Sequence, residues 1–412
     1  MARFVLLIVL SVPLWLWGQA GEDQALINFY SDADEIDQAY LRQEIKFVHY
    51  VRERLEADIH LLVTTQNTGG KGEAFTLTFI GQNRFAGVND TLTFMVQNSE
   101  TQELIRKKMI RVIKLALASY IKKLPVADNL SITYEPDSDA RGGKTEDKWH
   151  NWVFSIELNE DMDGEKSAAE LNLDAAINII RVTEKWKSRF VVEAEYDEER
   201  YDYEQVHTTS ISRSRGVELN IVRSLNNHWS MGAWIKYSSS TYNNLKKCFY
   251  IEPKLEYNFF PYSRSTREQL RISYGFQPRY QEYFEKTIYD KTDEMLYQQS
   301  LELNLAMVKT WGKIDLGLAA AHFFHDWRKN SLNFDSEFSL KLVRGLSLNL
   351  HGGLTYQRNQ LGLPKRDATI EEVLLQRREL ESQYSYYSMI GFTYSFGALY
   401  NDIVNPRFGS WW

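Results

Sequence analysis

A serine and a histidine on neighbouring stretches of alternating sequence are the first residues that could do chemistry. His322 closes the stretch that begins at Ile314, and Ser336 lies in the next stretch, residues 331–342. Both carry even numbers, so both fall on the apolar side of a two-stranded hairpin, and one pairing register would place them opposite each other. A Ser–His pair within hydrogen-bonding reach is the minimum for nucleophilic catalysis. The pair predicts a lipid hydrolase as an alternative function, although a single His among aromatic residues is more often an interface residue.

A larger set of charged side chains alternates with apolar residues along most of the chain. If the stretches that carry them are strands closed around water, these side chains line the interior, and their acidic surplus predicts a mild preference for cations. Ion pairs that merely brace the interior are the alternative. The predicted lumen-lining residues are Asp174, Glu193, Glu195, Glu218, Lys236, Glu252, Lys254, Glu256, Arg271, Glu302, Asp315, Glu337 and Lys341.

Several other kinds of chemistry have no support in the sequence. His322 and His325 fall on opposite faces of a strand, and no His or Cys cluster has the spacing of metal ligands, so no metal or cofactor is predicted. Cys248 is the single cysteine and cannot form an intramolecular disulfide. The net charge of −7 gives no overall electrostatic case for binding nucleic acid.

Strict alternation of apolar and polar residues defines the elements that carry the charged set. In residues 331–342, Leu332, Phe334 and Phe338 share one face, and after a turn at 344–345 the pattern resumes through residue 356. Side chains alternate between two faces only in strands, so this segment is a hairpin. The same pattern recurs from Trp149 to residue 397 and predicts about twelve strands.

The connections between these strands alternate in length. Short turns at 184–187, 225–228, 310–312 and 344–345 alternate with long polar loops at 197–209, 282–296 and 357–383. Aromatic residues crowd many strand ends, as in the girdles of transmembrane barrels. A soluble β-sandwich also alternates, but its strands are usually shorter and one face of each sheet forms a core. We therefore predict a mainly β fold: an antiparallel transmembrane β-barrel of about twelve strands, residues 149–397.

The N-terminus reads as an export signal. Arg3 precedes a continuous apolar run through Trp17, and Gly18 and Ala20 give small residues at a cleavage site. The run is too short for a spanning helix, although a signal anchor is the alternative reading. Residues 1–20 are predicted to be a signal peptide, and no other segment is long and apolar enough for a transmembrane helix.

Residues 21–140 follow a different pattern and predict a small α+β domain. Leu41, Ile45, Val48, Val51 and Leu55 have the spacing of a helix face, strands follow at about 59–63, 75–79 and 92–96, and a long helix runs to Lys123. Residues 27–30 and 130–134 are candidate edge strands. Residues 141–148 are predicted to be a linker and 398–412 a tail. Because the first barrel strand must leave the periplasm, we expect both the domain and the tail on that side.

Several segments also resemble a known group of proteins. Residues 44–81 (EIKFVHYVRERLEADIHLLVTTQNTGGKGEAFTLTFIG), LEYNFFPYSRSTREQL at 255–270, RGLSLNLHG at 344–352 and NPRFG at 405–409 resemble an uncharacterised family of Gram-negative outer-membrane β-barrel proteins with an N-terminal periplasmic α+β domain. The resemblance spans nearly the whole mature chain and implies the same architecture. It transfers no activity and no functional residues.

These patterns predict a bacterial outer-membrane protein in contact with lipid, which forms a narrow pore for transport or takes part in envelope assembly. In the second case, residues 21–140 would dock to a periplasmic protein partner. The lipid-facing His322 and Ser336 keep a hydrolase as the alternative.

Overall fold

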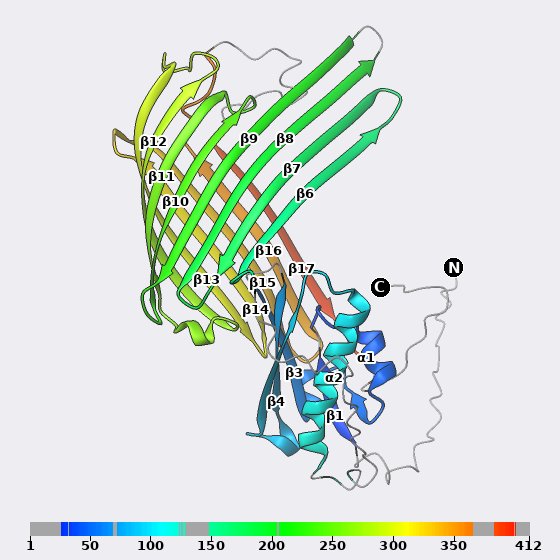
Figure 1. Ribbon diagram of the computed structural model, residues 1–412. Coiled ribbons are helices and arrows are strands. Elements are labelled where there is room, and N and C mark those ends of the chain that lie inside the picture. The colour runs from blue at the N-terminus through cyan, green and yellow to red at the C-terminus, as the bar shows by residue number, and fades with distance from the viewer. Residues whose placement is uncertain are drawn as a thin grey trace, which may run out of the picture.

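The computed structural model describes residues 26–31, 33–68, 72–122, 124, 127, 148–203, 206–365, 383–398 and 400. The predicted signal peptide, the strand at 130–134, most of the linker and most of the tail lie outside these residues. Two bodies of secondary structure stand out in Figure 1: a small α+β domain and a large curved antiparallel sheet.

The α+β domain is a five-stranded sheet covered by one long helix. In sheet order its strands are β2 (Val48–Tyr50), β1 (Ile27–Ser31), β3 (Ile59–Asn67), β4 (Glu73–Gly81) and β5 (Asn89–Val96). β1 runs parallel to both β2 and β3, whereas β3, β4 and β5 are antiparallel. The helices are α1 (Gln38–Glu44) and α2 (Gln102–Ile121).

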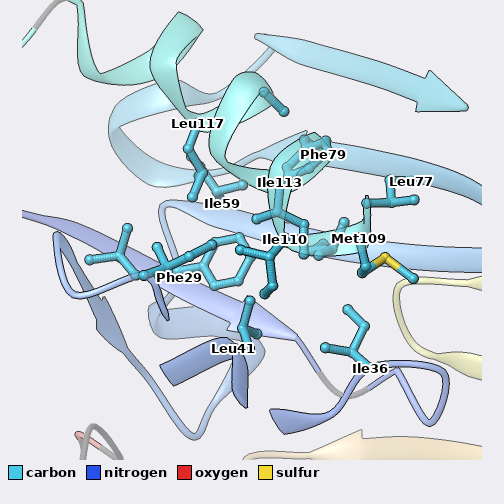
Figure 2. Packing of buried hydrophobic residues seen from close by; sticks show 14 of the residues in the cluster. Phe29, Ile36, Leu41, Ile59, Leu77, Phe79, Met109, Ile110, Ile113 and Leu117 are labelled. Atoms are coloured by element: carbon cyan, nitrogen blue, oxygen red, sulfur yellow. The ribbon is translucent and has the colours of Figure 1, made fainter. Parts of the chain in front are cut away.

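The core of the domain lies between α2 and the sheet. Thr101 caps the N-terminus of α2, because its side chain accepts a hydrogen bond from the backbone N–H of Leu104. Its apolar side, which includes Met109, Ile113 and Leu117, packs on Phe29 and other buried residues of the strands (Figure 2). No helix among the described residues has the length and apolar character needed to cross a membrane.

The helix predicted across residues 41–55 is wrong beyond Glu44. α1 ends there, and Val48–Tyr50 forms β2, which pairs with β1 through Ile27↔Val48 and Phe29↔Tyr50. β-Branched and aromatic residues fit a half-buried strand, and the available partner edge overrides the helical spacing. The expected strand at 27–30 is present, but it lies inside the sheet between β2 and β3 rather than at an edge.

The large sheet contains twelve strands, each paired only with its neighbours in the chain. The prediction of a mainly β chain with twelve antiparallel strands and a small α+β domain is confirmed. β6 and β17 are the two edges, and no pairing joins them among the described residues. The strands are β6 (Trp152–Gly164), β7 (Ala168–Val182), β8 (Trp186–Tyr203), β9 (Val206–Ser224), β10 (Trp229–Ser240), β11 (Leu245–Asn258), β12 (Glu268–Tyr283), β13 (Asp293–Lys309), β14 (Gly312–Phe323), β15 (Asp326–Val343), β16 (Leu346–Gln357) and β17 (Tyr384–Tyr394).

The connections fall into two groups, one at each end of the sheet. At the end beside the α+β domain, short turns join β7 to β8, β9 to β10, β13 to β14 and β15 to β16. We call this the turn end and the opposite side the loop end. The loop predicted at 197–209 is wrong in extent, because β8 continues to Tyr203 and β9 starts at Val206. The alternation of Glu195, Asp197 and Glu199 carries on through the supposed loop.

Candidate functional site

The charged set predicted from the sequence lies on a single face of the large sheet. Direct pairs link Asp174 with Glu195, Glu218 with Lys236, and Asp315 with Glu337. Residues paired across strands share a face, and so do residues two apart within a strand. Following the register from β7 to β15 places every one of the thirteen predicted residues on the same side.

This face is the concave one. Lys254 on β11 reaches Glu302 on β13 at 2.7 Å, and Lys236 on β10 reaches Glu193 on β8 at 3.6 Å, although a strand lies between the partners in each case. Neighbouring strands are about 4.8 Å apart, so side chains from alternate strands meet where the curvature brings them together. We call this surface the concave face.

Burial on the large sheet is inverted relative to a soluble protein. On β11, Glu252 is 8% exposed and Asn258 is fully buried, whereas Ile251 and Leu255 are 40% and 45% exposed. On β12 the same alternation separates buried Ser273 and Gln277 from exposed Tyr274 and Phe276. Apolar side chains normally fill the packed face of a sheet and polar ones face outward. The sheet therefore packs polar residues inside and presents apolar residues on its exterior along these strands.

Lys254 is the centre of an ion-pair cluster on the concave face. Its Nζ lies 2.7 Å from Glu302 Oε1 and 3.5 Å from Glu252 Oε1, and it sits 5.0 Å from the ring centroid of Trp234. Ser300 Oγ donates a hydrogen bond of 3.0 Å to Glu252. Trp234 is a member of this face that the sequence analysis missed, because a large aromatic residue resembles an outward-facing one.

Further pairs extend from this cluster toward both edges. Lys236 lies 3.3 Å from Glu218, Arg271 lies 3.9 Å from Glu256, and Lys313 lies 3.0 Å from Asp315. Lys313 also approaches Glu337 at 3.7 Å. The central and later strands of the concave face are thus largely charge-compensated.

The loop-end part of β7 and β8 is acidic without such compensation. Glu170, Asp197 and Glu199 lie on the concave face together with Glu195. The strand register shows this, because Glu170 pairs with Glu199 and Asp174 pairs with Glu195. A hollow of about 560 Å³ lies over them. Serines from β9 and β10 line its other side together with Arg215 and Lys236. Among the described residues, no Lys or Arg pairs with these four carboxylates. We call this surface the acidic wall.

The proposed Ser–His pair is not assembled. Ser336 is paired with Leu316, and His322 is paired with Asn330. Six positions therefore separate the two along the strand, about 20 Å at a rise of 3.4 Å per residue. The two-residue connection between β14 and β15 and the bulge at His322 and Phe323 set this register.

Both residues have structural partners instead. The ring of His322 stacks on Trp327 with centroids 3.8 Å apart and contacts Gln299, and Ser336 Oγ donates to the carbonyl of Gly352 at 3.0 Å. The hydrolase alternative is therefore wrong in its geometry. No group of three or more His, Cys, Asp or Glu suited to a metal ion occurs in the described part of the chain.

The segment after β16 crosses the loop end of the concave face. Leu361 packs on Leu296 of β13 and Phe323 of β14, both of which lie on that face. Ile288 donates its N–H to the carbonyl of Leu363, and Thr287 bridges to Pro364. We call residues 358–365 the strap.

Polar contacts hold the strap against the β10–β11 and β12–β13 connections. Asn244 Nδ2 donates to the carbonyls of Glu285 at 2.9 Å and Gly362 at 2.8 Å, and its Oδ1 accepts from the N–H of Glu285. Lys365 Nζ lies 2.6 Å from Asp290. The hydrogen bond from Lys365, with a second from Lys286, lowers the pKa of the Asp290 carboxyl below its usual value. The strap thus spans the loop end from β16 to the β10–β11 connection.

At the opposite end, the α+β domain contacts the turns of the sheet (Figure 1). Arg344 pairs with Glu56 at 3.0 Å, and Gly345 donates its N–H to Glu53 at 2.9 Å. Gln66 reaches Ser265, in the β11–β12 connection, at 3.0 Å. The contacts come from connections four strands apart, so the domain lies across part of the turn end.

Comparisons with known proteins add little to this description. No family model matches the sequence. No curated protein matches it either. Seven chains among the solved structures match. One is titled "NanC porin structure in rhombohedral crystal form", with 10% identity, a TM-score of 0.26, and coverage of 59% of this chain and all of that one. A TM-score this low does not support an inference about fold or function, and the fold is defined by the pairing of the strands.

Proposed function

We propose that this chain is an outer-membrane β-barrel whose concave face lines a narrow, cation-preferring pore. The inverted burial of the large sheet carries the proposal. In water, leaving the side chains of Ile251 and Leu255 exposed while Glu252 is buried would lower the stability of the fold. Each Å² of apolar surface that stays exposed forgoes about 25 cal/mol of stabilising free energy. In a bilayer the same apolar exterior meets hydrocarbon.

Closure follows from the two edges of the sheet. β6 and β17 run in opposite directions, because they are the first and last of twelve strands whose direction alternates. Their pairing would be antiparallel and would satisfy the unpaired backbone groups of both edges, which hydrocarbon cannot do. Barrels of exported bacterial chains have even strand numbers. We infer that β6 and β17 join in the membrane.

Heat-modifiable electrophoretic mobility tests this architecture. Membrane-extracted protein should migrate as a compact band without boiling and more slowly after boiling, since a closed barrel resists detergent at room temperature. If the processed chain is water-soluble without detergent, the barrel proposal is wrong.

The acidic wall gives the pore its proposed selectivity. Carboxylates that lack Lys or Arg partners concentrate cations in the hollow above them and repel anions. In planar bilayers under a KCl gradient, the reversal potential should indicate potassium preference. The variant Glu195→Gln/Asp197→Asn/Glu199→Gln should lose most of that preference.

A matched control lies on the same strand. Glu198 belongs to the opposite face, where it contacts Tyr196 and Arg200, so Glu198→Gln removes one charge without touching the concave face. It should leave the reversal potential unchanged. Absence of conductance, or an anion preference in the unmodified protein, contradicts the pore.

Envelope assembly is the second candidate, and a strand edge that has no pairing partner among the described residues favours it. β5 ends the five-stranded sheet, and its Met95 is largely exposed. A free edge can accept a strand from another protein. A photo-crosslinker at Met95 should yield one discrete adduct in living cells. A crosslinker at the exposed Leu115 of α2 is the control, and equal patterns from the two sites would argue against docking at β5.

A further inference from the structure

A row of carboxylates runs along the concave side of β8, through the acidic wall. Its members are two residues apart in the chain, so they share a face and lie about 7 Å from one another, twice the rise per residue. The row consists of Glu193, Glu195, Asp197 and Glu199. On β7, Glu170 pairs directly with Glu199 and adds a further carboxylate beside the row. The concave face thus carries negative charge at even intervals toward the loop end.

Hydroxyl groups of the next strand face this row. The register of β8 and β9 pairs Glu195 with Ser214, Asp197 with Ser212, and Glu199 with Ser210. Ser214 Oγ donates a hydrogen bond of 2.8 Å to Glu195. Ser210 is only 5% exposed and lines the hollow, and its hydroxyl has no hydrogen-bond partner among the described residues. Since a buried hydroxyl is normally paired, Ser210 indicates that a polar group enters the hollow from outside.

The chain itself shows which kind of cation this row accepts. The ammonium group of Lys236 lies 3.6 Å from Glu193 and 3.3 Å from Glu218, and Lys236 lines the hollow. It therefore compensates the first carboxylate of the row. Arg215 also lines the hollow, but its pairing with Ala194 places its side chain on the other face of the sheet. The rest of the row lacks a cation within the described ranges.

The even spacing does not suit a single metal ion. Such an ion draws several ligands to within about 2.6 Å of itself. No group of three or more His, Cys, Asp or Glu in the described part of the chain is placed to do this. A linear polyamine differs, because its ammonium groups are spread along a flexible methylene chain and each can meet a different carboxylate.

We propose that the acidic wall binds a linear polyamine, whose ammonium groups continue the row of cations that Lys236 begins. They pair with Glu195, Asp197 and Glu199 through charge-assisted hydrogen bonds, and the hydroxyl of Ser210 accepts one more. A polyamine is then the favoured solute of the pore. The inference rests on the proposed function, because it takes the concave face as the interior of a barrel.

Calorimetric titration of the detergent-extracted full-length protein with spermine tests the site. Spermine should bind at least about tenfold more tightly than butylamine, which has a single ammonium group, because each added charge-assisted hydrogen bond contributes about that factor. The variant Glu195→Gln/Asp197→Asn/Glu199→Gln should bind spermine about a hundredfold more weakly for the same reason. Glu198→Gln, on the opposite face, should bind it as the unmodified protein does.

Lys236→Met separates this site from general attraction to a negative protein. The substitution frees Glu193 and lengthens the row by one carboxylate, so spermine should bind about tenfold more tightly. Lys313→Met changes the net charge equally, but Lys313 lies on β14, outside the hollow, and its loss should leave the affinity unchanged. Equal effects of the two substitutions would overturn the site.

Three further results would also overturn it: equal affinities for spermine and butylamine, tighter binding of Mg²⁺ than of spermine, or full affinity in the triple variant. Heat-modifiable mobility shows whether each variant folds, and if the triple variant does not, the comparison of Lys236→Met with Lys313→Met decides. The pore and this site fail separately. Potassium-selective conductance without spermine binding would overturn the site alone, whereas spermine binding without conductance would support the site and contradict the pore.

Discussion

The carboxylate of Glu53 accepts a 2.9 Å hydrogen bond from the backbone N–H of Gly345, which lies 292 positions further along the chain. Gly345 belongs to the turn between β15 and β16, and its neighbour Arg344 pairs with Glu56. Two acidic residues of one short segment thus engage one turn of the large sheet. Among the described residues, polar contacts such as these join the α+β domain to the large sheet.

Glu53→Gln should loosen this contact. A hydrogen bond to a charged acceptor contributes about 1.5–3 kcal/mol, and the neutral amide retains only part of it. Hydrogen exchange at Gly345 should accelerate while exchange in the core of the domain is unchanged. Glu44→Gln, which removes a carboxylate paired with Lys114 away from the turn, is the control. Unchanged exchange at Gly345 would contradict the role of Glu53.

Gly345→Ala should impair formation of the β15–β16 hairpin. Gly345 has a φ of +72°, and an added Cβ would lie 2.1 Å from the backbone carbonyl oxygen of Ser395. The left-handed backbone alone costs about 1–2 kcal/mol for a residue with a side chain. We expect a lower yield of the heat-modifiable form. Gly317→Ala, where a Cβ meets only Asn304 at 3.8 Å, should give a normal yield.

Lys254→Met should destabilise the large sheet. Removing the lysine leaves Glu252 and Glu302 close together on a largely buried surface, and breaking a buried pair costs about 3–5 kcal/mol. The unboiled band should convert at a lower temperature. Lys313→Met removes a half-exposed pair with Asp315, worth at most about 1 kcal/mol, so it should shift the conversion little. Similar shifts for both variants would mean that the cluster at Lys254 is solvated.

Asn244→Gly should release the strap. The substitution removes three hydrogen bonds to Glu285 and Gly362, and glycine tolerates the φ of +56° that Asn244 adopts. If the strap narrows the loop end, single-channel conductance should rise. Asn243→Gly, at the exposed neighbouring position, should leave conductance unchanged. Equal conductance in the two variants would show that the strap does not limit flow.

Tyr120 should titrate late. Burial raises the pKa of its hydroxyl to about 12, and the hydroxyl donates to the carbonyl of Val88 at 3.1 Å. Between the ordinary pKa of about 10 and this value, the unfolded chain releases the proton and the folded chain keeps it, so the stability of the domain falls as pH rises. The tyrosinate absorbance that Tyr120→Phe removes should appear near pH 12. Its appearance near pH 10 would mean an exposed hydroxyl.

The strand number and the face of each charged residue were predictable because alternation is a local property. Asp174 and Lys341 both lie on the concave face, because side chains in a strand alternate between its two faces and each residue falls on the polar side of that alternation. Of the acidic wall, only Glu195 was predicted, since Glu170 was not singled out and Asp197 and Glu199 were assigned to a loop. Their spacing after Glu195 carried the signal, but polar strand ends lack the apolar residues that reveal a strand.

Registers and partners were not predictable in this way. The hydrolase hypothesis failed because only two residues connect β14 to β15, and this short connection pairs His322 with Asn330 rather than with Ser336. β2 was read as helix because its pairing with β1 depends on residues far away in the chain. The contacts of Glu53 and of the strap join segments that no local pattern relates.

In the described part of the chain, every strand of the large sheet pairs with its sequence neighbours alone. Such a meander can be assembled one hairpin at a time, with each new strand finding a template at the growing edge and closing only a short loop. The greatest sequence separation would be left for the proposed final event, the pairing of β6 with β17. A chain halted before that event would expose two unpaired strand edges, and such edges can pair with other chains.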